Sequence, residues 1–160
     1  MEKTITKKQV SGVLKILKEG RKSRSALGDV YIQEYKGKNY ATLSDGKCAV
    51  MIPTNATKTG IIPFIEIENW YKLAKAKDKL DFTIFEENLQ DDRPILDIPG
   101  FFDNKIVAVE TIALNSNILQ TLQIILGADY VLIDFNGQYK PLFVSRPKSD
   151  IIALMMPLRI

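Results

Sequence analysis

Histidine is absent from this chain of 160 residues, and cysteine occurs only once, as Cys48. The missing histidine removes the commonest general base and the commonest metal ligand of proteins. A single thiol cannot form an internal disulfide and cannot supply a zinc cluster of the usual kind. We therefore expect a protein of the reducing cytoplasm that binds no metal and needs no cofactor.

The sequence also lacks the glycine-rich loops that hold nucleotide phosphates, since neither G-x-x-x-x-G-K-[ST] nor G-x-G-x-x-G occurs in it. Its apolar runs are far shorter than a membrane span, and its first residues do not form a signal peptide. We therefore expect no nucleotide site of these kinds and no association with a membrane.

Four carboxylates that lie close together in the sequence could carry chemistry. They are Glu86, Glu87, Asp91 and Asp92. Such a group could hold a divalent cation or serve a small enzyme, but Asn88 and Gln90 lie among the four, and apolar runs flank the group. This setting favours a solvated turn. We expect that the protein is not an enzyme.

The composition is that of an ordinary soluble globular protein, with 46% hydrophobic and 26% charged residues. The length suffices for one domain or a compact pair of domains, and for a real core. Because the formal net charge is only +3, any contact with nucleic acid must depend on where the positive side chains gather.

Hydrophobic periodicity and capping residues predict three helices. The first spans residues 7–18, and Gly20 is expected to end it. The second spans residues 68–77. Asn115 is the predicted N-cap of the third helix, and Gly127 is expected to stop it.

Runs of β-branched and aromatic residues predict strands between and after these helices. Asp45-Gly46 and Asn136-Gly137 are strong turn signals between strands. The predicted strands and extended segments are residues 29–35, 39–43, 48–52, 61–66, 80–85, 95–98, 106–114, 130–135, 142–144 and 151–156.

This order repeats a unit of a strand, a helix and several strands. The pattern is typical of an α+β fold, with antiparallel sheets and the helices gathered on one face. We divide the chain into a first unit (residues 1–60), a degenerate middle unit or insertion (residues 61–104) and a last unit (residues 105–160). The three are expected to form one compact body.

Positive side chains recur at helical spacing on the first two helices. They are Lys8, Lys15, Lys18 and Lys22 with Arg24 on and after the first helix, and Lys72 and Lys75 on the second. A basic helical face can neutralise DNA phosphates without reading the bases. The alternative for the stripe alone is a solvated lysine face, which is about as common. The outer positions of the third helix carry no positive charge.

Two stretches of the sequence resemble the bacterial DNA polymerase sliding clamp, the beta subunit. The chain ends on Met156-Pro157-Leu158-Arg159-Ile160, which is similar to the last strand of the clamp family. Upstream, residues 112–122 resemble the entry into the last repeat of that family, a strand followed by Asn115 and a helix. The resemblance implies the DNA-clamp fold, in which strand–helix–strands units repeat.

The second stretch is Tyr40–Val50, which resembles the Ala-Thr-Asp-Gly-His-Arg-Leu-Ala hairpin of the clamp family. In that family the hairpin and the C-terminal strand line the groove that receives a short linear peptide of a polymerase or another partner. Carried over to this chain, one wall of the groove would be Ser44, Gly46, Lys47, Cys48 and Ala49, and the other Leu154, Met156, Pro157 and Leu158. This chain departs from the family pattern at Lys47-Cys48, where the family has His-Arg, and at Ala49, where it has Leu.

The resemblance implies a DNA replication and processivity factor that contacts or encircles duplex DNA nonspecifically. It would tether a DNA polymerase or other replication proteins through a short linear peptide, and would form a homo-oligomer to surround DNA. An alternative is a clamp-fold interaction module, of a phage or mobile-element type, that binds partner peptides without encircling DNA.

Overall fold

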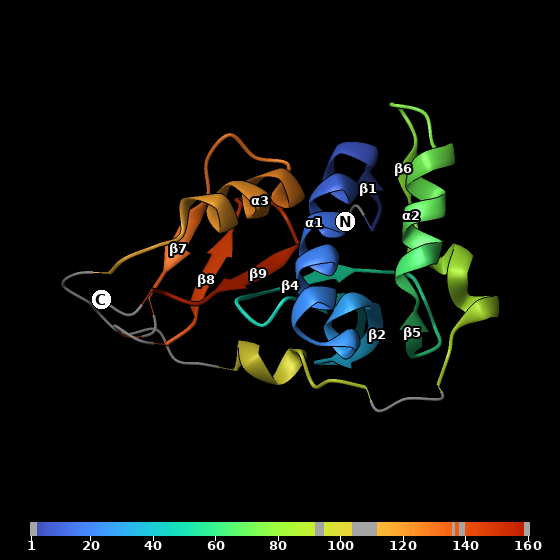
Figure 1. The fold of residues 1–160 in the computed structure, drawn as a ribbon, viewed down its shortest axis with the longest axis horizontal. Coiled ribbons are helices and arrows are strands. Elements are labelled where there is room, and N and C mark those ends of the chain that lie inside the picture. The colour runs from blue at the N-terminus through green and yellow to red at the C-terminus, as the bar shows by residue number, and fades with distance from the viewer. Residues whose placement is uncertain (1–2, 92–94, 104–111, 136, 138–139, 159–160) are drawn as a thin grey trace.

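One antiparallel sheet of seven strands, in the order β5-β2-β3-β4-β9-β8-β7, organises the molecule (Figure 1). The computed structural model describes residues 3–91, 95–103, 112–135, 137 and 140–158. The strands of this sheet are β2 (Val30–Tyr35), β3 (Lys38–Ser44), β4 (Cys48–Pro53), β5 (Gly60–Ile62), β7 (Leu132–Asp134), β8 (Leu142–Ser145) and β9 (Ile152–Met155). Strand β9 near the C-terminus pairs with β4, so Ala49 lies opposite Leu154. The two stretches predicted to form a groove are therefore neighbours in one sheet.

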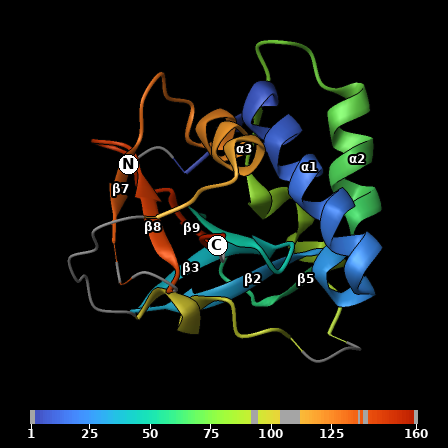
Figure 2. The same ribbon diagram turned by 60° about the vertical axis from the view of Figure 1, so that its left-hand side comes forward.

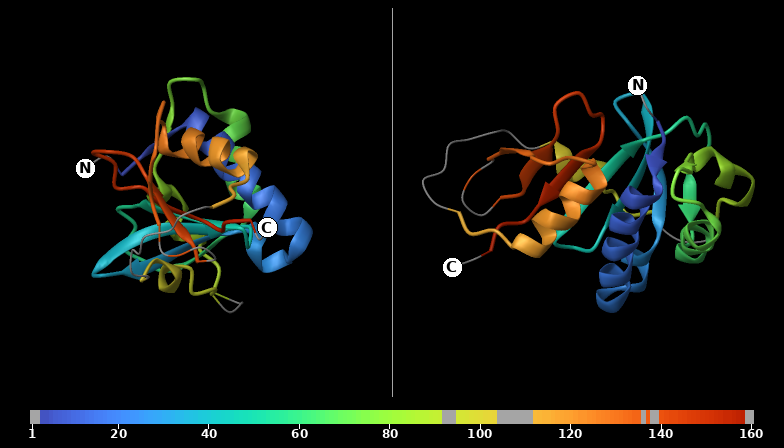
Figure 3. Two further views of the ribbon diagram at one scale, coloured as in Figure 1. Left: turned by 90° about the vertical axis from the view of Figure 1, so that its left-hand side faces the viewer. Right: turned by 90° about the horizontal axis from the view of Figure 1, so that it is seen from above.

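Among the described residues, three α-helices cover one face of this sheet. They are α1 (Lys7–Ser23), α2 (Phe64–Leu73) and α3 (Ser116–Leu126). Helix α1 lies between the other two, which is clearest when the molecule is seen from above (Figure 3). A small second sheet, β1 (Ile5–Thr6) with β6 (Lys79–Leu80), ties the start of α1 to the chain after α2. This arrangement confirms the predicted α+β class, with antiparallel sheets and the helices on one face.

The sheet has an apolar layer on each face because side chains alternate along its strands. The larger core lies between the sheet and the helices and includes Cys48, Val50 and Met155. The smaller core lies on the opposite face and includes Ala49 and Leu154. Residues adjacent in the sequence thus point to opposite sides of the molecule, and Cys48 points toward the helices.

A segment from the middle of the chain, residues 95–103, crosses the face of the sheet that the helices leave open (Figure 2). We call it the strap. It contains the short 3₁₀-helix η3 (Pro99–Phe102), and Ile98 and Phe102 are buried against the sheet. The Nε2 of Gln33 donates a hydrogen bond of 2.6 Å to the carbonyl oxygen of Leu96. The strap therefore closes the second core.

The prediction that Gly20 ends the first helix is wrong. Helix α1 continues to Ser23, and Gly20 is buried where the 3₁₀-helix η1 (Ser25–Gly28) packs against it. A Cβ atom at Gly20 would lie 2.2 Å from the carbonyl oxygen of Leu27. The glycine is needed here for close packing inside a helix, which a sequence pattern cannot distinguish from a helix stop.

The second helix and two strands were also predicted wrongly. Helix α2 begins at Phe64 and ends at Leu73, earlier at both ends than predicted. Residues 80–85, predicted as a strand, hold only the end of β6 before the 3₁₀-helix η2 (Phe82–Asn88) begins. Residues 95–98 belong to the strap and form no strand. Of the predicted strand 106–114, residues 106–111 lie outside the described residues.

The predicted extended segment 61–66 is wrong in its second half, because β5 ends at Ile62 and α2 begins at Phe64. The other strands and the third helix agree with the predictions to within a few residues at each end. The side-chain oxygen of Asn115 accepts hydrogen bonds from the backbone N–H groups of Asn117 and Ile118, which is the predicted N-cap. Gly127 adopts a left-handed conformation, with φ of 63°, at the other end of α3. The division of the chain into three units stays a prediction. In the part of the chain that the structure describes, every helix is too short or too polar to cross a bilayer.

Candidate functional site

A small apolar cavity, which we call the apolar pocket, opens beside the β4–β9 pair. Its volume is about 100 Å³. The residues that line it come from the β3–β4 turn, from the strap and from the strands at the C-terminal end of the chain; they are Ser44, Gly46, Lys47, Cys48, Ala49, Phe101, Pro141, Leu154 and Met156. Its floor is apolar and closely packed, because Ala49 and Leu154 are buried members of the smaller core.

Hydrogen bonds hold the turn that forms one wall of the apolar pocket. Asp45 Oδ1 accepts hydrogen bonds of 2.8 Å from the backbone N–H groups of Lys47 and Cys48. Gly46 has φ of 85°, a conformation that favours glycine. The backbone N–H of Met156 donates to the carbonyl oxygen of Lys47 at 2.8 Å, which fixes the distance between the two walls. The pocket is therefore formed by backbone that is already ordered.

Seven of the nine predicted groove residues line this pocket: Ser44, Gly46, Lys47, Cys48, Ala49, Leu154 and Met156. Pro157 and Leu158 do not. Pro157 is buried, and Leu158 forms a backbone bridge with Ala113, to whose carbonyl oxygen it donates at 2.8 Å.

Two residues that line the pocket, Phe101 and Pro141, were not predicted from the sequence. Phe101 lies on the strap, far from both walls in the sequence. The only signal was an aromatic pair, Phe101-Phe102, after Pro99-Gly100, and such a pair does not show which of its rings is exposed.

The thiol of Cys48 belongs to the helix side of the sheet although its residue lines the apolar pocket. Burial raises the pKa of this thiol well above its usual value, and the nearby carboxylate of Asp45 raises it further. A thiol with a raised pKa is a poor nucleophile at neutral pH. Cys48 is therefore a packing residue, and we expect slow alkylation.

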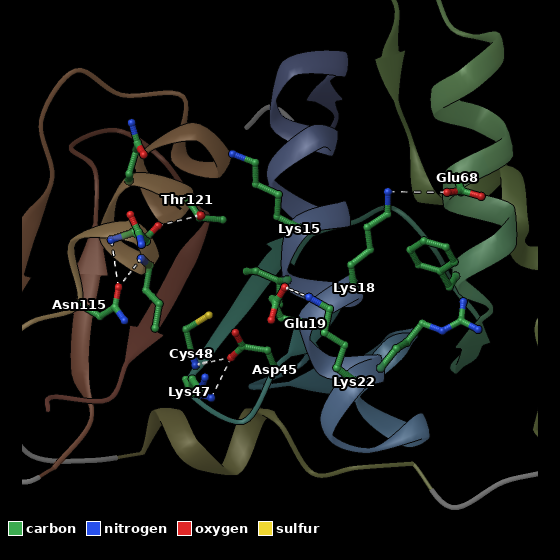
Figure 4. A pocket seen from close by; sticks show the side chains of 16 residues that line it. Lys15, Lys18, Glu19, Lys22, Asp45, Lys47, Cys48, Glu68, Asn115 and Thr121 are labelled. Atoms are coloured by element: carbon green, nitrogen blue, oxygen red, sulfur yellow. Dashed lines mark hydrogen bonds and ion pairs between the residues drawn. The ribbon is translucent and has the colours of Figure 1, made fainter. Parts of the chain in front are cut away.

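A second and larger hollow, which we call the basic cleft, lies on the outer side of the helices (Figure 4). Its volume is about 830 Å³. Positive side chains from α1 and the β3–β4 turn line it, together with neutral polar side chains from α3. The positive ones are Lys15, Lys18, Arg21, Lys22 and Lys47, and the neutral polar ones are Asn115, Asn117, Gln120 and Thr121.

Carboxylates neutralise part of this positive charge. Glu19 Oε1 lies 2.6 Å from the Nζ of Lys22, and Glu68 lies 3.8 Å from Lys18 and 2.9 Å from Lys72. Lys22 holds the pKa of Glu19 below its usual value, and Lys72 does the same for Glu68. Both glutamates are therefore charged at neutral pH. Within the described residues, Lys15 and Lys47 form no ion pair.

The predicted DNA-contacting residues divide into three groups. Lys15, Lys18 and Lys22 line the basic cleft. Lys8 lines a neighbouring polar hollow between α1, α3 and the β8–β9 connection. Arg24, Lys72 and Lys75 line neither hollow, and Lys75 lies beyond the end of α2 rather than on it. Sequence reasoning missed Arg21, whose guanidinium lies 4.7 Å from the centre of the Phe64 ring, and assigned Lys47 only to the groove.

One member of the acidic group, Glu86, has a structural role at the end of η2. Glu86 accepts hydrogen bonds from the backbone N–H groups of Thr57 and Lys58, and these bonds lower its pKa. Asp92 lies outside the described residues. Among those that are described, no three histidine, cysteine, aspartate or glutamate side chains are placed to hold a metal ion.

Comparison with solved structures places this architecture among the bacterial sliding clamps. DNA polymerase III subunit beta from Borrelia burgdorferi, solved in complex with a natural product, has a TM-score of 0.69 at 12% sequence identity. The DNA polymerase sliding clamp from Bacillus subtilis has a TM-score of 0.60 at 14% sequence identity, and a putative DNA polymerase III beta subunit from Eubacterium rectale has a TM-score of 0.61 at 9% identity. The resemblance inferred from the sequence is thus confirmed for the fold.

Each of these matches covers 98% of this chain but only 64% or 65% of the clamp chain. This chain therefore spans less than two thirds of the length of the clamps that it matches. No protein-family model matches the sequence, and no curated protein matches it. The low identities mark a divergent clamp-like chain.

Proposed function

We propose, on the premise that this chain has the fold of the bacterial sliding clamps, that it is a clamp-like processivity factor and not an enzyme. Its basic helical layer contacts the phosphates of duplex DNA without reading sequence. Its apolar pocket binds a short linear peptide of a DNA polymerase or another replication protein. The pocket thus tethers the partner to the DNA.

The apolar pocket carries this proposal. Residues of the two predicted walls, from the β3–β4 turn and from the C-terminal strand, line one apolar hollow together with Phe101 and Pro141. A peptide site needs an apolar floor and a few polar groups that orient the ligand. Ala49 and Leu154 supply the floor, and Met156, 39% exposed, supplies an adaptable wall.

The basic cleft supports the DNA part of the proposal. Helix α1 presents Lys15 and Lys18 on the side away from the sheet, and Lys15 faces α3 across the cleft (Figure 4). The side-chain amide groups of Gln120 and Asn117, at the α3 side of the cleft, can donate hydrogen bonds to phosphate oxygens, whereas the hydroxyl of Thr121 already donates to the carbonyl oxygen of Asn117. The third helix therefore takes part through neutral donors, although it carries no positive charge.

The second candidate function is a clamp-fold interaction module that binds partner peptides without a role on DNA. The ion pairs of the helical layer favour it. Glu19 pairs with Lys22, and Glu68 lies between Lys18 and Lys72, so these two carboxylates offset two of the three positive charges and leave less net charge for phosphates than the sequence suggests. Salt-dependent DNA binding distinguishes the two functions, because only the processivity factor requires it.

Encirclement of DNA would require self-association. The seven-stranded sheet ends at β5 and β7. Ile61 of β5 already forms a backbone bridge with Gln90 on its outer side, so β7 is the edge strand that we consider for pairing between copies. Light scattering at several protein concentrations tests this step. A discrete symmetric oligomer supports a closed ring, and a monomer at every concentration refutes unaided ring formation.

The peptide site is tested with a library of random linear heptapeptides displayed on phage and selected on the purified protein. Met156→Glu is expected to abolish binding of the selected peptides, because a carboxylate at the wall of an apolar cavity must be desolvated when the cavity fills. Leu158→Glu is the matched control, since Leu158 is 46% exposed and lies outside the pocket. Circular dichroism checks that both variants fold.

Loss of binding in the Met156 variant alone supports the groove. Equal binding by the wild type and both variants, or the selection of no peptide, refutes it.

A further inference from the structure

Lys47 lies where the basic cleft and the apolar pocket meet. The β3–β4 turn separates the two hollows, and Lys47 and Cys48 line both of them. The thiol of Cys48 is buried toward the helices, whereas the side chain of Lys47 is exposed. Within the described residues, Lys47 is therefore the one charged side chain that the two sites share.

The backbone of Lys47 is fixed, and only its side chain is free to move. Its N–H donates to Asp45 Oδ1 at 2.8 Å, and its carbonyl oxygen accepts the hydrogen bond of 2.8 Å from the N–H of Met156. A lysine carries its ammonium group on a flexible four-carbon stem. The ammonium can therefore turn toward the cleft or toward the pocket while the backbone of the turn stays in place.

The charge of Lys47 already acts on the basic cleft. Lys22 is the main cause of the lowered pKa of Glu19, and the charge of Lys47 lowers this pKa further. Figure 4 shows Lys47 and Asp45 on the turn, with Glu19 and Lys22 on α1. Asp45 accepts backbone hydrogen bonds and, among the residues that the structure describes, forms no ion pair with Lys47. The ammonium of Lys47 is thus available to an anion from solution.

The same ammonium is the only formal charge among the residues that line the apolar pocket. The other lining residues are neutral: Ser44, Gly46, Cys48, Ala49, Phe101, Pro141, Leu154 and Met156. An acidic side chain on a bound peptide therefore has one cation to approach at this site. It loses that cation when a DNA phosphate holds Lys47 in the cleft, whereas a neutral peptide loses nothing.

We propose that Lys47 couples the two sites, so that duplex DNA in the basic cleft and an acidic peptide at the apolar pocket compete for its ammonium group. This inference rests on the proposed function and adds a way in which that function is regulated. By thermodynamic linkage, each ligand weakens the binding of the other by the same factor. A partner with an acidic segment therefore loosens the hold on DNA when it binds, and a partner with a neutral segment does not.

The size of the coupling is that of one phosphate contact. Each contact contributes about 0.9 to the slope of log K against log salt concentration, which at about 0.1 M salt corresponds to about eightfold in affinity. Duplex DNA should therefore weaken the binding of an acidic peptide by up to about eightfold. The bound peptide should in turn reduce the salt slope of DNA binding by up to about 0.9.

The test needs a peptide that occupies the apolar pocket. It is selected on the purified protein from a phage library of heptapeptides in which aspartate is fixed at the central position and every other residue is uncharged. Peptides that also bind Met156→Glu are discarded. A matched peptide carries asparagine in place of the aspartate. Fluorescence anisotropy of each labelled peptide gives its dissociation constant with and without a saturating duplex of about 20 base pairs, at about 0.1 M salt.

For the wild type, we expect the duplex to weaken the aspartate peptide by up to about eightfold and to leave the asparagine peptide unchanged. Lys47→Gln should remove this difference, because glutamine keeps the backbone hydrogen bonds of the turn and lacks the charge. Lys58→Gln is the matched control, since Lys58 is exposed and lies outside both hollows. This variant loses the same charge and should couple the two ligands as the wild type does.

Equal weakening of both peptides, or no weakening of either, overturns this inference and leaves the proposed function standing, provided that each ligand binds alone. A coupling that survives in Lys47→Gln, or that disappears in Lys58→Gln, also overturns the inference alone. If no peptide is selected, or if the duplex does not bind, the proposed function and this inference fall together.

Discussion

Neutralising Glu19 is expected to strengthen the association of this protein with duplex DNA. Its Oε1 lies 2.6 Å from the Nζ of Lys22 at the wall of the basic cleft, and Lys22 holds its pKa below the usual value. The carboxylate therefore competes with phosphate for Lys22 at any pH near neutrality. Glu19→Gln removes this competitor and leaves the length of the side chain unchanged.

The magnitude follows from counterion release. Each phosphate that a lysine neutralises adds about 0.9 to the slope of log K against log salt concentration. One additional contact by Lys22 thus steepens the slope by up to about 0.9, which at 0.1 M salt corresponds to about eightfold higher affinity. Lys15→Gln should reduce the slope by a similar amount, because Lys15 lines the cleft and forms no ion pair within the described residues.

The assay is fluorescence anisotropy of a labelled duplex of about 20 base pairs, measured at pH 6 and at pH 8. The salt concentration is varied from roughly 0.05 to 0.3 M, a range over which such slopes can be resolved. Because the chain has no histidine and the pKa of Glu19 is lowered, the effect of Glu19→Gln should be the same at both pH values. Two controls change the net charge equally at exposed sites outside the cleft: Glu87→Gln and Lys58→Gln.

Three results would refute this reasoning. No DNA binding by any variant would favour the interaction module over the processivity factor. Equal gains for Glu19→Gln and Glu87→Gln would show that only net charge matters. An unchanged slope for Lys15→Gln would mean that the lysine stripe is a solvated face.

Two further predictions concern the core. Gly20→Ala should destabilise the protein by about 1–3 kcal/mol in urea unfolding, although alanine favours a helix by about 1 kcal/mol. The reason is that the new Cβ atom would lie 2.2 Å from the carbonyl oxygen of Leu27. Ser11→Ala, on the exposed side of α1, is the control. A Gly20→Ala variant that is as stable as the wild type, or more stable, would contradict the close packing. For Cys48, folding keeps the thiol protonated because its pKa is raised, so the stability it contributes is complete below the unfolded pKa of about 8.5 and declines as the pH rises above it. Above that pH, the free energy of unfolding of the wild type should fall, relative to that of Cys48→Ala, by up to about 1.4 kcal/mol per pH unit. Iodoacetamide should react slowly with the native protein at pH 8. Parallel curves of stability against pH for the two proteins, or rapid alkylation, would contradict a buried thiol.

Local signals predicted those parts of the fold that depend on neighbouring residues. Asn115 and Gly127 bound α3 as predicted, because capping needs only a side-chain acceptor at one end and a left-handed residue at the other. The turn at Asp45-Gly46 also forms, since its hydrogen bonds lie within the turn itself. These elements bring the predicted walls of the pocket into the sheet.

The same rules failed where distant parts of the chain decide the outcome. Gly20 was read as a helix stop because nothing near it in the sequence shows that Leu27 packs against it. Residues 80–85 alternate like a strand, but Phe82 and Phe85 are buried from a 3₁₀-helix, in which two side chains three positions apart lie on one side.

The sequence by itself determined the class of the fold, the hairpin and C-terminal strand that enclose the pocket, and the lysines of α1, because each depends on periodicity, turn chemistry or residue type. Only the tertiary structure decided that Phe101 lines the pocket, that Cys48 points to the helices, and that Glu19 and Glu68 offset part of the charge of the basic layer. The physical reason is that each of these features depends on packing: Phe101 on how the strap lies on the sheet, Cys48 on which face of β4 meets the helices, and the two glutamates on the rotamers of neighbouring side chains. Such pairings arise only when the chain packs.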